Sequence, residues 1–308
     1  MNTIINTTKK SLASSLIIAL FLSLGLLAGC RRTNVASAPP IGPAIPKAGV
    51  HSLGTLINAG QLMVLMERDD VILVDMSEAP NQVIPGAVWL DRNLLIHEVD
   101  GGRMAIQTLE VHEHVLGQHG ISNSHIIVVY CNQHNLWATR LLWQLRAYGH
   151  ERVKLLDGGT SAWLAAGGIV YERASPPRAP AEFRALNRVG FVRADLADVL
   201  DAKHNPNWAL VDIRTPGEWN AGRIPSALQF TFPGDIRNAD GTFKPAHELE
   251  ALFSDIPRNQ RIIVYCMVGV RAANLWFALT DIVGWPQRVL MYDGSWWNYV
   301  WSGSPIER

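Results

Sequence analysis

Short apolar runs alternate with amphipathic segments along the chain from about residue 51 onward. Residues 71–75 and 126–130 are runs rich in valine, isoleucine and leucine, a composition typical of parallel strands that are buried on both faces. Further elements predicted in this half are helices near residues 53–68 and at 136–148 and 161–166, and a strand at 153–155. The alternation predicts an α/β fold with mainly parallel sheets flanked by helices.

The same pattern occurs a second time, about 136 residues later. Four stretches of the first half match stretches of the second half in the same order: 71–75 with 208–212, 84–87 with 224–227, 126–131 with 262–266, and 156–159 with 292–295. An ordered set of matches at a nearly constant offset indicates a tandem repeat of one structural unit.

Prolines separate the two units. Pro176, Pro177 and Pro180 lie in a segment, residues 171–188, that has no helical or strand period, as expected of a linker. We therefore expect a first domain at residues 51–170 and a second at residues 189–308.

The N-terminus has the pattern of a secretory signal. Lys9 and Lys10 precede a long apolar run, and small residues precede Cys30 in Leu-Ala-Gly-Cys, the order of features found in signal peptides. This ending resembles the lipobox of bacterial lipoproteins. The resemblance implies removal of residues 1–29 and lipidation of the Cys30 thiol; an uncleaved membrane anchor with a chance cysteine is the alternative.

The following segment, residues 30–50, is rich in proline and alanine, and we expect it to be an extended tether. The folded part would then be exported, periplasmic and held at a membrane by the N-terminal lipid. Because residue 31 is arginine and not aspartate, the sorting rule known for Gram-negative lipoproteins implies the outer membrane if the cell is Gram-negative.

Composition narrows the functional classes. The chain has 27 basic and 27 acidic residues, so its net charge does not favour nucleic-acid binding. The three cysteines are far apart, and no spacing of cysteine and histidine suits a metal ion. His112 and His114 are expected on the polar surface of a helix. We predict no metal and no other cofactor.

The strongest chemical signal surrounds Cys266. An apolar run at residues 262–265 is followed by this cysteine, and residues 272–279 have helical composition. Gly269 allows a tight turn and Arg271 falls in the first helical turn, so that backbone N–H groups would form a cradle for an anion. Such a field can lower the cysteine pKa from about 8.5 to roughly 3.5–7.5. This predicts a nucleophilic thiolate; a buried cysteine that only packs is the alternative.

The loop Cys266-Met267-Val268-Gly269-Val270-Arg271 resembles the active-site loop of the rhodanese family of thiosulfate and 3-mercaptopyruvate sulfurtransferases. In that family a loop of six residues, cysteine to arginine, holds a persulfide sulfur, whereas related cell-cycle phosphatases have one residue more. The resemblance implies that Cys266 is catalytic and that the substrate is bound by the loop residues Met267, Val268, Gly269, Val270 and Arg271.

A second motif, from Asp212 to Trp219, resembles the strand-end motif of the same family. We expect Asp212 and Arg214 to form a buried ion pair that positions loops. Glu218 is expected to pair with Arg271 and orient it; a solvated glutamate at a helix start is the alternative.

The first domain lacks part of this pattern. Cys131 occupies the place of Cys266, but neither the glycine nor the arginine of the loop follows it, and Asp75 has no arginine two positions later. The resemblance to two-domain sulfurtransferases implies a non-catalytic first domain. A role for Cys131, beside His134, as an acceptor or resolving thiol is the alternative.

Together these features predict a sulfurtransferase that moves sulfur from a small anionic donor to a thiol or cyanide through a Cys266 persulfide. The loop sequence matches neither the animal thiosulfate enzymes nor the mercaptopyruvate enzymes, and its apolar Met267 and Val268 favour thiosulfate or a persulfide donor. Two alternatives are a mercaptopyruvate sulfurtransferase and a persulfide carrier with low turnover. The loop size disfavours a phosphatase.

Overall fold

A computed structural model describes residues 54–308 of the chain except residues 100–102, 174 and 177. The predicted signal peptide, Cys30 and the whole of the predicted tether lie outside the described residues. Each helix that the structure describes is too short or too polar to cross a bilayer.

The first domain contains a five-stranded parallel sheet in the order β1-β7-β6-β2-β3 and an antiparallel pair, β4-β5. Its elements are β1 (Leu56–Ile57), α1 (Ala59–Leu65), β2 (Val71–Asp75), β3 (Val88–Trp89), η2 (Arg92–Leu94), β4 (Ile96–Val99), β5 (Arg103–Ile106), α2 (Leu109–Gln118), β6 (Ile126–Tyr130), α3 (Leu136–Ala147), β7 (Val153–Leu156) and α4 (Gly159–Ala165).

The second domain repeats this topology, with a parallel sheet in the order β8-β12-β11-β9-β10. Its elements are η3 (Val189–Phe191), β8 (Arg193–Ala194), α5 (Leu196–Ala202), β9 (Trp208–Asp212), α6 (Pro216–Ala221), β10 (Leu228–Gln229), α7 (Ala246–Leu252), β11 (Arg261–Tyr265), α8 (Val270–Phe277), the π-helical turn η4 (Ala278–Ile282), β12 (Val289–Tyr292) and α9 (Ser295–Trp301). The α/β fold and the repeat expected from the sequence are confirmed.

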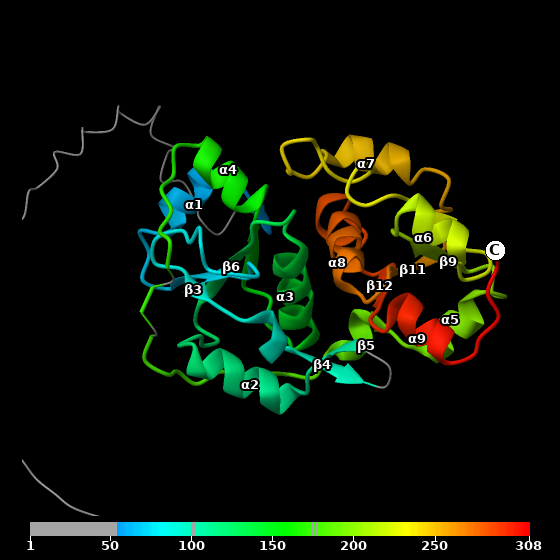
Figure 1. Cartoon of the computed structure of the whole chain (residues 1–308), viewed down its shortest axis with the longest axis horizontal. Helices are drawn as coiled ribbons and strands as arrows, with labels where there is room; N and C mark the ends of the chain where they lie inside the picture. The colour runs from blue at the N-terminus through cyan, green and yellow to red at the C-terminus, as the bar shows by residue number, and fades with distance from the viewer. Residues whose placement is uncertain (1–53, 100–102, 174, 177) are drawn as a thin grey trace, which may run out of the picture. The chain divides into compact units, whose positions relative to one another are not determined.

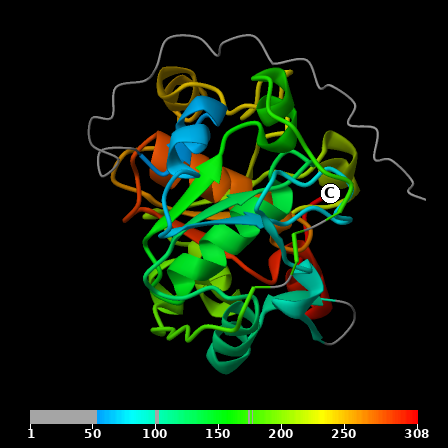
Figure 2. The same cartoon turned by 90° about the vertical axis from the view of Figure 1, so that its left-hand side faces the viewer.

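Side chains of each central strand alternate between two apolar layers. In β2, Ile72 and Val74 belong to a layer with α2 and α3, whereas Val71 and Leu73 belong to a layer with α1 and α4. Figure 2 shows α1 (blue) above and α2 (teal) below the strands of this sheet. Because both faces are covered, every residue of β2 is buried, which explains its uninterrupted apolar sequence.

One apolar core continues from the first domain into the second. The layer that contains α3 also contains α8 and the inner faces of β9 and β11, and α3 packs directly on α8, its neighbour in Figure 1. The described residues accordingly belong to a single unit by their contacts. The catalytic candidate Cys266 is itself a member of this shared layer, which brings the first domain close to it.

Two predicted helix boundaries were wrong. The helix predicted near residues 53–68 is preceded by the short strand β1 and begins only at Ala59, because Asn58 adopts an extended conformation (φ −88°) and caps the helix in a reciprocal box with Gln61. The helix predicted at residues 272–279 begins two residues earlier, at Val270, and continues into η4.

The prediction for His112 was wrong as well. His112 and His114 both lie on α2, but only His114 is exposed; His112 is fully buried, with its ring centroid 4.5 Å from that of Tyr148. Residues two apart on a helix point in nearly opposite directions, so a helix that packs on one side buries one member of such a pair.

This burial predicts a loss of stability in mild acid. Burial lowers the pKa of His112 and of His150 to about 4 from 6.5, so the unfolded chain binds more protons between pH 6.5 and 4. The free energy of unfolding should fall as pH decreases through this window, by at most about 3 kcal/mol for each histidine. Urea titrations of His112→Gln should show a shallower pH dependence, by about one proton, and an unchanged slope would contradict the assignment.

Candidate active site

Cys266 stands at the carboxyl end of β11, a central strand of the second sheet, and its side chain is 1% exposed. The turn after β12 holds the backbone of Cys266 by two hydrogen bonds. The Cys266 N–H group donates to Ser295 Oγ (3.2 Å), and the Cys266 carbonyl accepts from the Trp296 N–H group (2.9 Å). Ser295 has a positive φ of 50°. The base of the loop is thereby fixed to the start of α9.

The loop after Cys266 presents unused hydrogen-bond donors. Gly269 is in the left-handed region (φ 83°) and α8 begins at the next residue. Within the part of the chain that the structure describes, the N–H groups of residues 267–271 donate to no acceptor. The first N–H groups of a helix have no intrahelical partner and carry the positive end of its dipole. Next to a cysteine, they form the anion cradle that the loop sequence predicts.

Arg271 and Glu218 form a bidentate ion pair. Arg271 Nη1 and Nη2 each lie 2.7 Å from a carboxylate oxygen of Glu218. Glu218 also accepts from the Thr215 N–H group at the start of α6. It is therefore both a helix-start residue and the partner of Arg271, the two roles that the sequence left as alternatives. The Arg271 guanidinium holds the pKa of Glu218 to about 2, so the pair remains ionised at neutral pH. Since both terminal nitrogens of Arg271 are engaged, Glu218 fixes its direction.

Asp212 and Arg214 form the buried ion pair expected from the sequence. Arg214 Nη2 lies 2.7 Å from Asp212 Oδ2, and both side chains are at most 1% exposed. Arg214 also donates to the Gly222 carbonyl at the end of α6, and its guanidinium lies 4.3 Å from the centroid of the Trp296 ring. The pair therefore ties β9 to α6, which carries Glu218, and to α9, which supports the Cys266 loop.

The equivalent loop of the first domain is closed by a side chain. Asn135 has a positive φ of 53°, and its amide oxygen accepts from the Cys131 N–H group (3.0 Å) while its amide nitrogen donates to the Leu156 carbonyl (2.6 Å). His134, also with positive φ, takes the place of the loop glycine. Burial raises the pKa of the Cys131 thiol, which favours the protonated, unreactive form.

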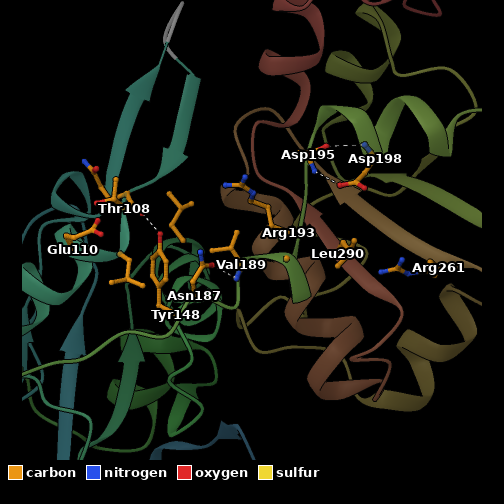
Figure 3. A pocket seen from close by; sticks show the side chains of 14 residues that line it. Thr108, Glu110, Tyr148, Asn187, Val189, Arg193, Asp195, Asp198, Arg261 and Leu290 are labelled. Carbon is orange, nitrogen blue, oxygen red and sulfur yellow. Dashed lines mark hydrogen bonds between the residues drawn. The ribbon is translucent and has the colours of Figure 1, made fainter.

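Two cavities of about 750 Å³ each lie elsewhere in the molecule. Figure 3 shows one of them, with Thr108 and Tyr148 from the first domain facing Arg193 from the second. Neither cavity is lined by Cys266. Among the described residues no group of three or more histidine, cysteine, aspartate or glutamate side chains could hold a metal ion.

Sequence reasoning missed two charged residues beside the loop. Arg140, from α3 of the first domain, forms an ion pair with Asp293, which follows β12. Asp293 belongs to an Asp-Gly motif that occurs in both halves, so a turn explains it without any reference to the loop. Arg140 carries no local signal, because its partner is 153 residues away.

The closeness of these groups to Gly269 makes this position sensitive to substitution. A Cβ atom on residue 269 would lie 2.7 Å from the Asp293 carbonyl oxygen and 2.9 Å from Arg140 Nη1, in addition to the left-handed φ. Gly269→Ala should therefore displace the loop and lower the rate of the sulfur transfer that the sequence predicts by about tenfold or more. The measurement is the steady-state rate with thiosulfate, the donor expected from the sequence.

Gly284→Ala is the matched control for Gly269→Ala, because Gly284 has the same φ of 83° and a Cβ atom there meets nothing within 4 Å. It should incur only the backbone strain of about 1–2 kcal/mol and retain the parent rate. Equal rates for the two variants would contradict the packing argument.

Both halves of the chain match one family model. A model described as a rhodanese-like domain matches residues 58–166 and residues 195–300, which is more than half of the chain. The two matched regions contain the two strand-end cysteines, Cys131 and Cys266.

Curated relatives of similar length have sulfur-related names. A Corynebacterium glutamicum protein named thiosulfate sulfurtransferase is 31% identical over 267 residues, which cover 79% of this chain and 84% of that protein. A Saccharopolyspora erythraea protein with a provisional assignment as a thiosulfate sulfurtransferase is 32% identical over 266 residues, or 79% and 92% of the two chains. The sulfur carrier protein TtuD of Thermus thermophilus is 33% identical over 212 residues, or 61% and 73%.

Solved structures share the fold. A structure of an EanB variant that carries a cysteine persulfide, with ergothioneine, has a TM-score of 0.72 and 25% identity, covering 82% of this chain and 70% of that one. YnjE, with a TM-score of 0.73 and 24% identity over 82% and 69% of the chains, is similar in fold.

Proposed function

Because this chain belongs to the rhodanese family of sulfur-transfer proteins, we propose that Cys266 is its nucleophile and that thiosulfate or a related sulfane sulfur compound is its donor. The observation that carries the proposal is the set of five N–H groups, residues 267–271, that directly follow Cys266 and have no acceptor within the described part of the chain. They give an anionic sulfur group the hydrogen bonds that a neutral substrate would not need.

The reaction proceeds by two displacements on sulfur. The Cys266 thiolate attacks the outer sulfur of thiosulfate; a sulfur–sulfur bond forms, the bond within thiosulfate breaks, and sulfite leaves with the electron pair. Cys266 then carries a persulfide anion within the loop. A thiolate or cyanide attacks the terminal sulfur, and the Cys266 thiolate is released for the next cycle. Division into two steps through a covalent intermediate is the benefit of a nucleophilic cysteine.

Each part of the site has a role in this scheme. The N–H groups of Met267, Val268, Gly269, Val270 and Arg271 bind the sulfur anion, and the Arg271 guanidinium adds positive potential in a direction set by Glu218. Asp212 and Arg214 hold the supporting elements and do not react. In the first domain, the Asn132 and Leu136 N–H groups after Cys131 already donate to Ser77 Oγ and the Gln133 carbonyl, so we propose no second catalytic centre there.

The test is thiocyanate formation by the purified protein from thiosulfate and cyanide. Initial rates at several concentrations of both substrates should give the parallel double-reciprocal lines of a ping-pong mechanism. After thiosulfate alone, mass spectrometry should find about 32 Da, one sulfur, added to the peptide of Cys266. An unmodified Cys266 peptide together with no thiocyanate would overturn the proposal.

A persulfide carrier is the second candidate, favoured by the similarity to the sulfur carrier protein of Thermus thermophilus. A carrier would show the added sulfur on Cys266 but slow thiocyanate formation. Transfer to a protein thiol would then exceed transfer to cyanide.

The N-terminal sequence supports a proposal about where in the cell the protein acts. We propose that the protein is exported and attached to a membrane through lipidated Cys30, with residues 30–50 as the tether. Cells grown with an alkyne-bearing palmitate should label the protein, and Cys30→Ala should abolish the label. Labelling that persists in Cys30→Ala would contradict lipidation at this residue.

A further inference from the structure

A buried arginine of the first domain lies against the Cys266 loop of the second. Arg140 is on α3, its side chain is 1% exposed, and its Nη2 atom lies 2.5 Å from Asp293 Oδ1. The other carboxylate oxygen of Asp293 accepts from the N–H group of Ile106 (3.0 Å), also from the first domain. Asp293 is thereby fixed by two contacts from across the domain boundary.

This ion pair touches the loop itself. Arg140 Nη1 is 2.9 Å, and the Asp293 carbonyl oxygen 2.7 Å, from the position that a Cβ atom on Gly269 would occupy. Gly269 is the third residue after Cys266 and precedes the first residue of α8. The Arg140 guanidinium and the turn that contains Asp293 therefore block movements of this segment that would spread the loop N–H groups apart.

Two nitrogens of Arg140 are unused. Within the described part of the chain, Nε and Nη1 are buried and have no hydrogen-bond partner. An unsatisfied buried polar atom costs about 1–3 kcal/mol, and apolar side chains can replace a buried ion pair at little or no cost in stability. Stability alone therefore does not explain an arginine here, and its place beside the loop offers another reason.

We propose that Arg140 is a positioning residue for the Cys266 loop, so that the first domain completes the active site of the second. Through Asp293 and Gly269 it holds the loop N–H groups converged. Its Nη1 donor, which has no partner among the described residues, adds positive potential on the side of the loop that faces the first domain. The inference rests on the proposed function of Cys266. It assigns to the first domain a contribution to catalysis without any reaction at Cys131.

The molecule provides a control for the loss of a buried arginine near the domain boundary. Arg237 of the second domain is 3% exposed and donates to Asn274 and to the Gly241 carbonyl. The neighbouring Phe243 N–H group donates to Asp157 of the first domain (2.9 Å), which is the counterpart of Asp293. Arg237→Met therefore disturbs the domain boundary on the Cys131 side, as Arg140→Met does on the Cys266 side.

The experiment compares Arg140→Met, Arg140→Lys and Arg237→Met in the full chain with Cys131→Ala. Alkylation of Cys266 by iodoacetamide is followed against pH by peptide mass spectrometry, and persulfide loading is followed in a single turnover with thiosulfate. Arg140→Met should raise the midpoint of alkylation by about one pH unit and slow loading about tenfold. Arg140→Lys, which retains the charge, should recover part of both effects, and Arg237→Met should change neither.

Two results would overturn the proposal: equal alkylation midpoints and loading rates in Arg140→Met and Arg237→Met, or no difference between Arg140→Met and the parent. If Arg140→Met does not fold, Arg140→Lys supplies the comparison, because lysine retains the charge but has no second terminal nitrogen to take the place of Nη1 beside Gly269. Parent-like loading in Arg140→Lys would then overturn the proposal. Alkylation needs no sulfur donor, so a parent that alkylates normally but takes up no sulfur shows a failure of the proposed function instead.

Discussion

Replacement of Cys266 with alanine should lower sulfur transfer by about a thousandfold or more, whereas replacement of Cys131 with alanine should retain the parent rate within about twofold. The difference follows from the two loops. The N–H groups of residues 267–271 after Cys266 have no acceptor among the described residues. In the first loop, Ser77 Oγ accepts from the Asn132 N–H group and the Gln133 carbonyl accepts from the Leu136 N–H group. Burial also favours the protonated form of the Cys131 thiol. The measurement is thiocyanate formation at saturating thiosulfate and cyanide.

Folding and persulfide content separate a chemical effect from a structural one. Both variants should unfold within a few degrees of the parent, because each exchange removes a single sulfur atom from a well-packed site. Only Cys131→Ala should still acquire a persulfide. A Cys131→Ala protein with a large loss of activity at unchanged melting temperature would restore the alternative of an acceptor or resolving role for this thiol.

The fold could be predicted because its central strands are buried on both faces. The apolar runs of β2 and β6 match their predicted bounds, since a strand covered by helices on both sides needs no polar position. The two-residue strands β1, β3, β8 and β10 were missed, because two residues define no period.

The candidate site could be predicted only as far as it is local in sequence. Cys266, Gly269 and Arg271 lie within six residues, so one short motif specifies the loop. Arg214 bonds to an aspartate two positions away, so a second short motif specifies this ion pair. Arg140 reaches Asp293 across 153 residues, and only the packing of α3 on α8 brings them together. Asn135 spans the first loop in a left-handed conformation. Asparagine tolerates this conformation, but an asparagine in the sequence does not predict it.

The two strand-end aspartates should respond in opposite ways to the same neutral substitution. Asp212→Asn removes the charge that compensates Arg214, and the side chains of both residues are at most 1% exposed. The loss of one partner of a buried ion pair lowers the free energy of unfolding by about 3–5 kcal/mol. Asp75, its counterpart in the first domain, has Ser77 where Asp212 has Arg214, and its Oδ2 atom has no partner among the described residues. Guanidinium titrations at pH 7 measure both variants.

The direction of the stability change in Asp75→Asn follows from the pKa of Asp75, which burial raises above its ordinary value. A carboxyl group with a higher pKa in the folded than in the unfolded protein opposes folding once the pH exceeds the unfolded value, about 3.9. Asp75→Asn abolishes this penalty and can still accept from the Ser77 N–H group, so its free energy of unfolding at pH 7 should equal or exceed that of the parent. A loss as large as that of Asp212→Asn would mean that the Asp75 carboxylate has a cationic partner after all, and that the two domains differ less at this position than their sequences indicate.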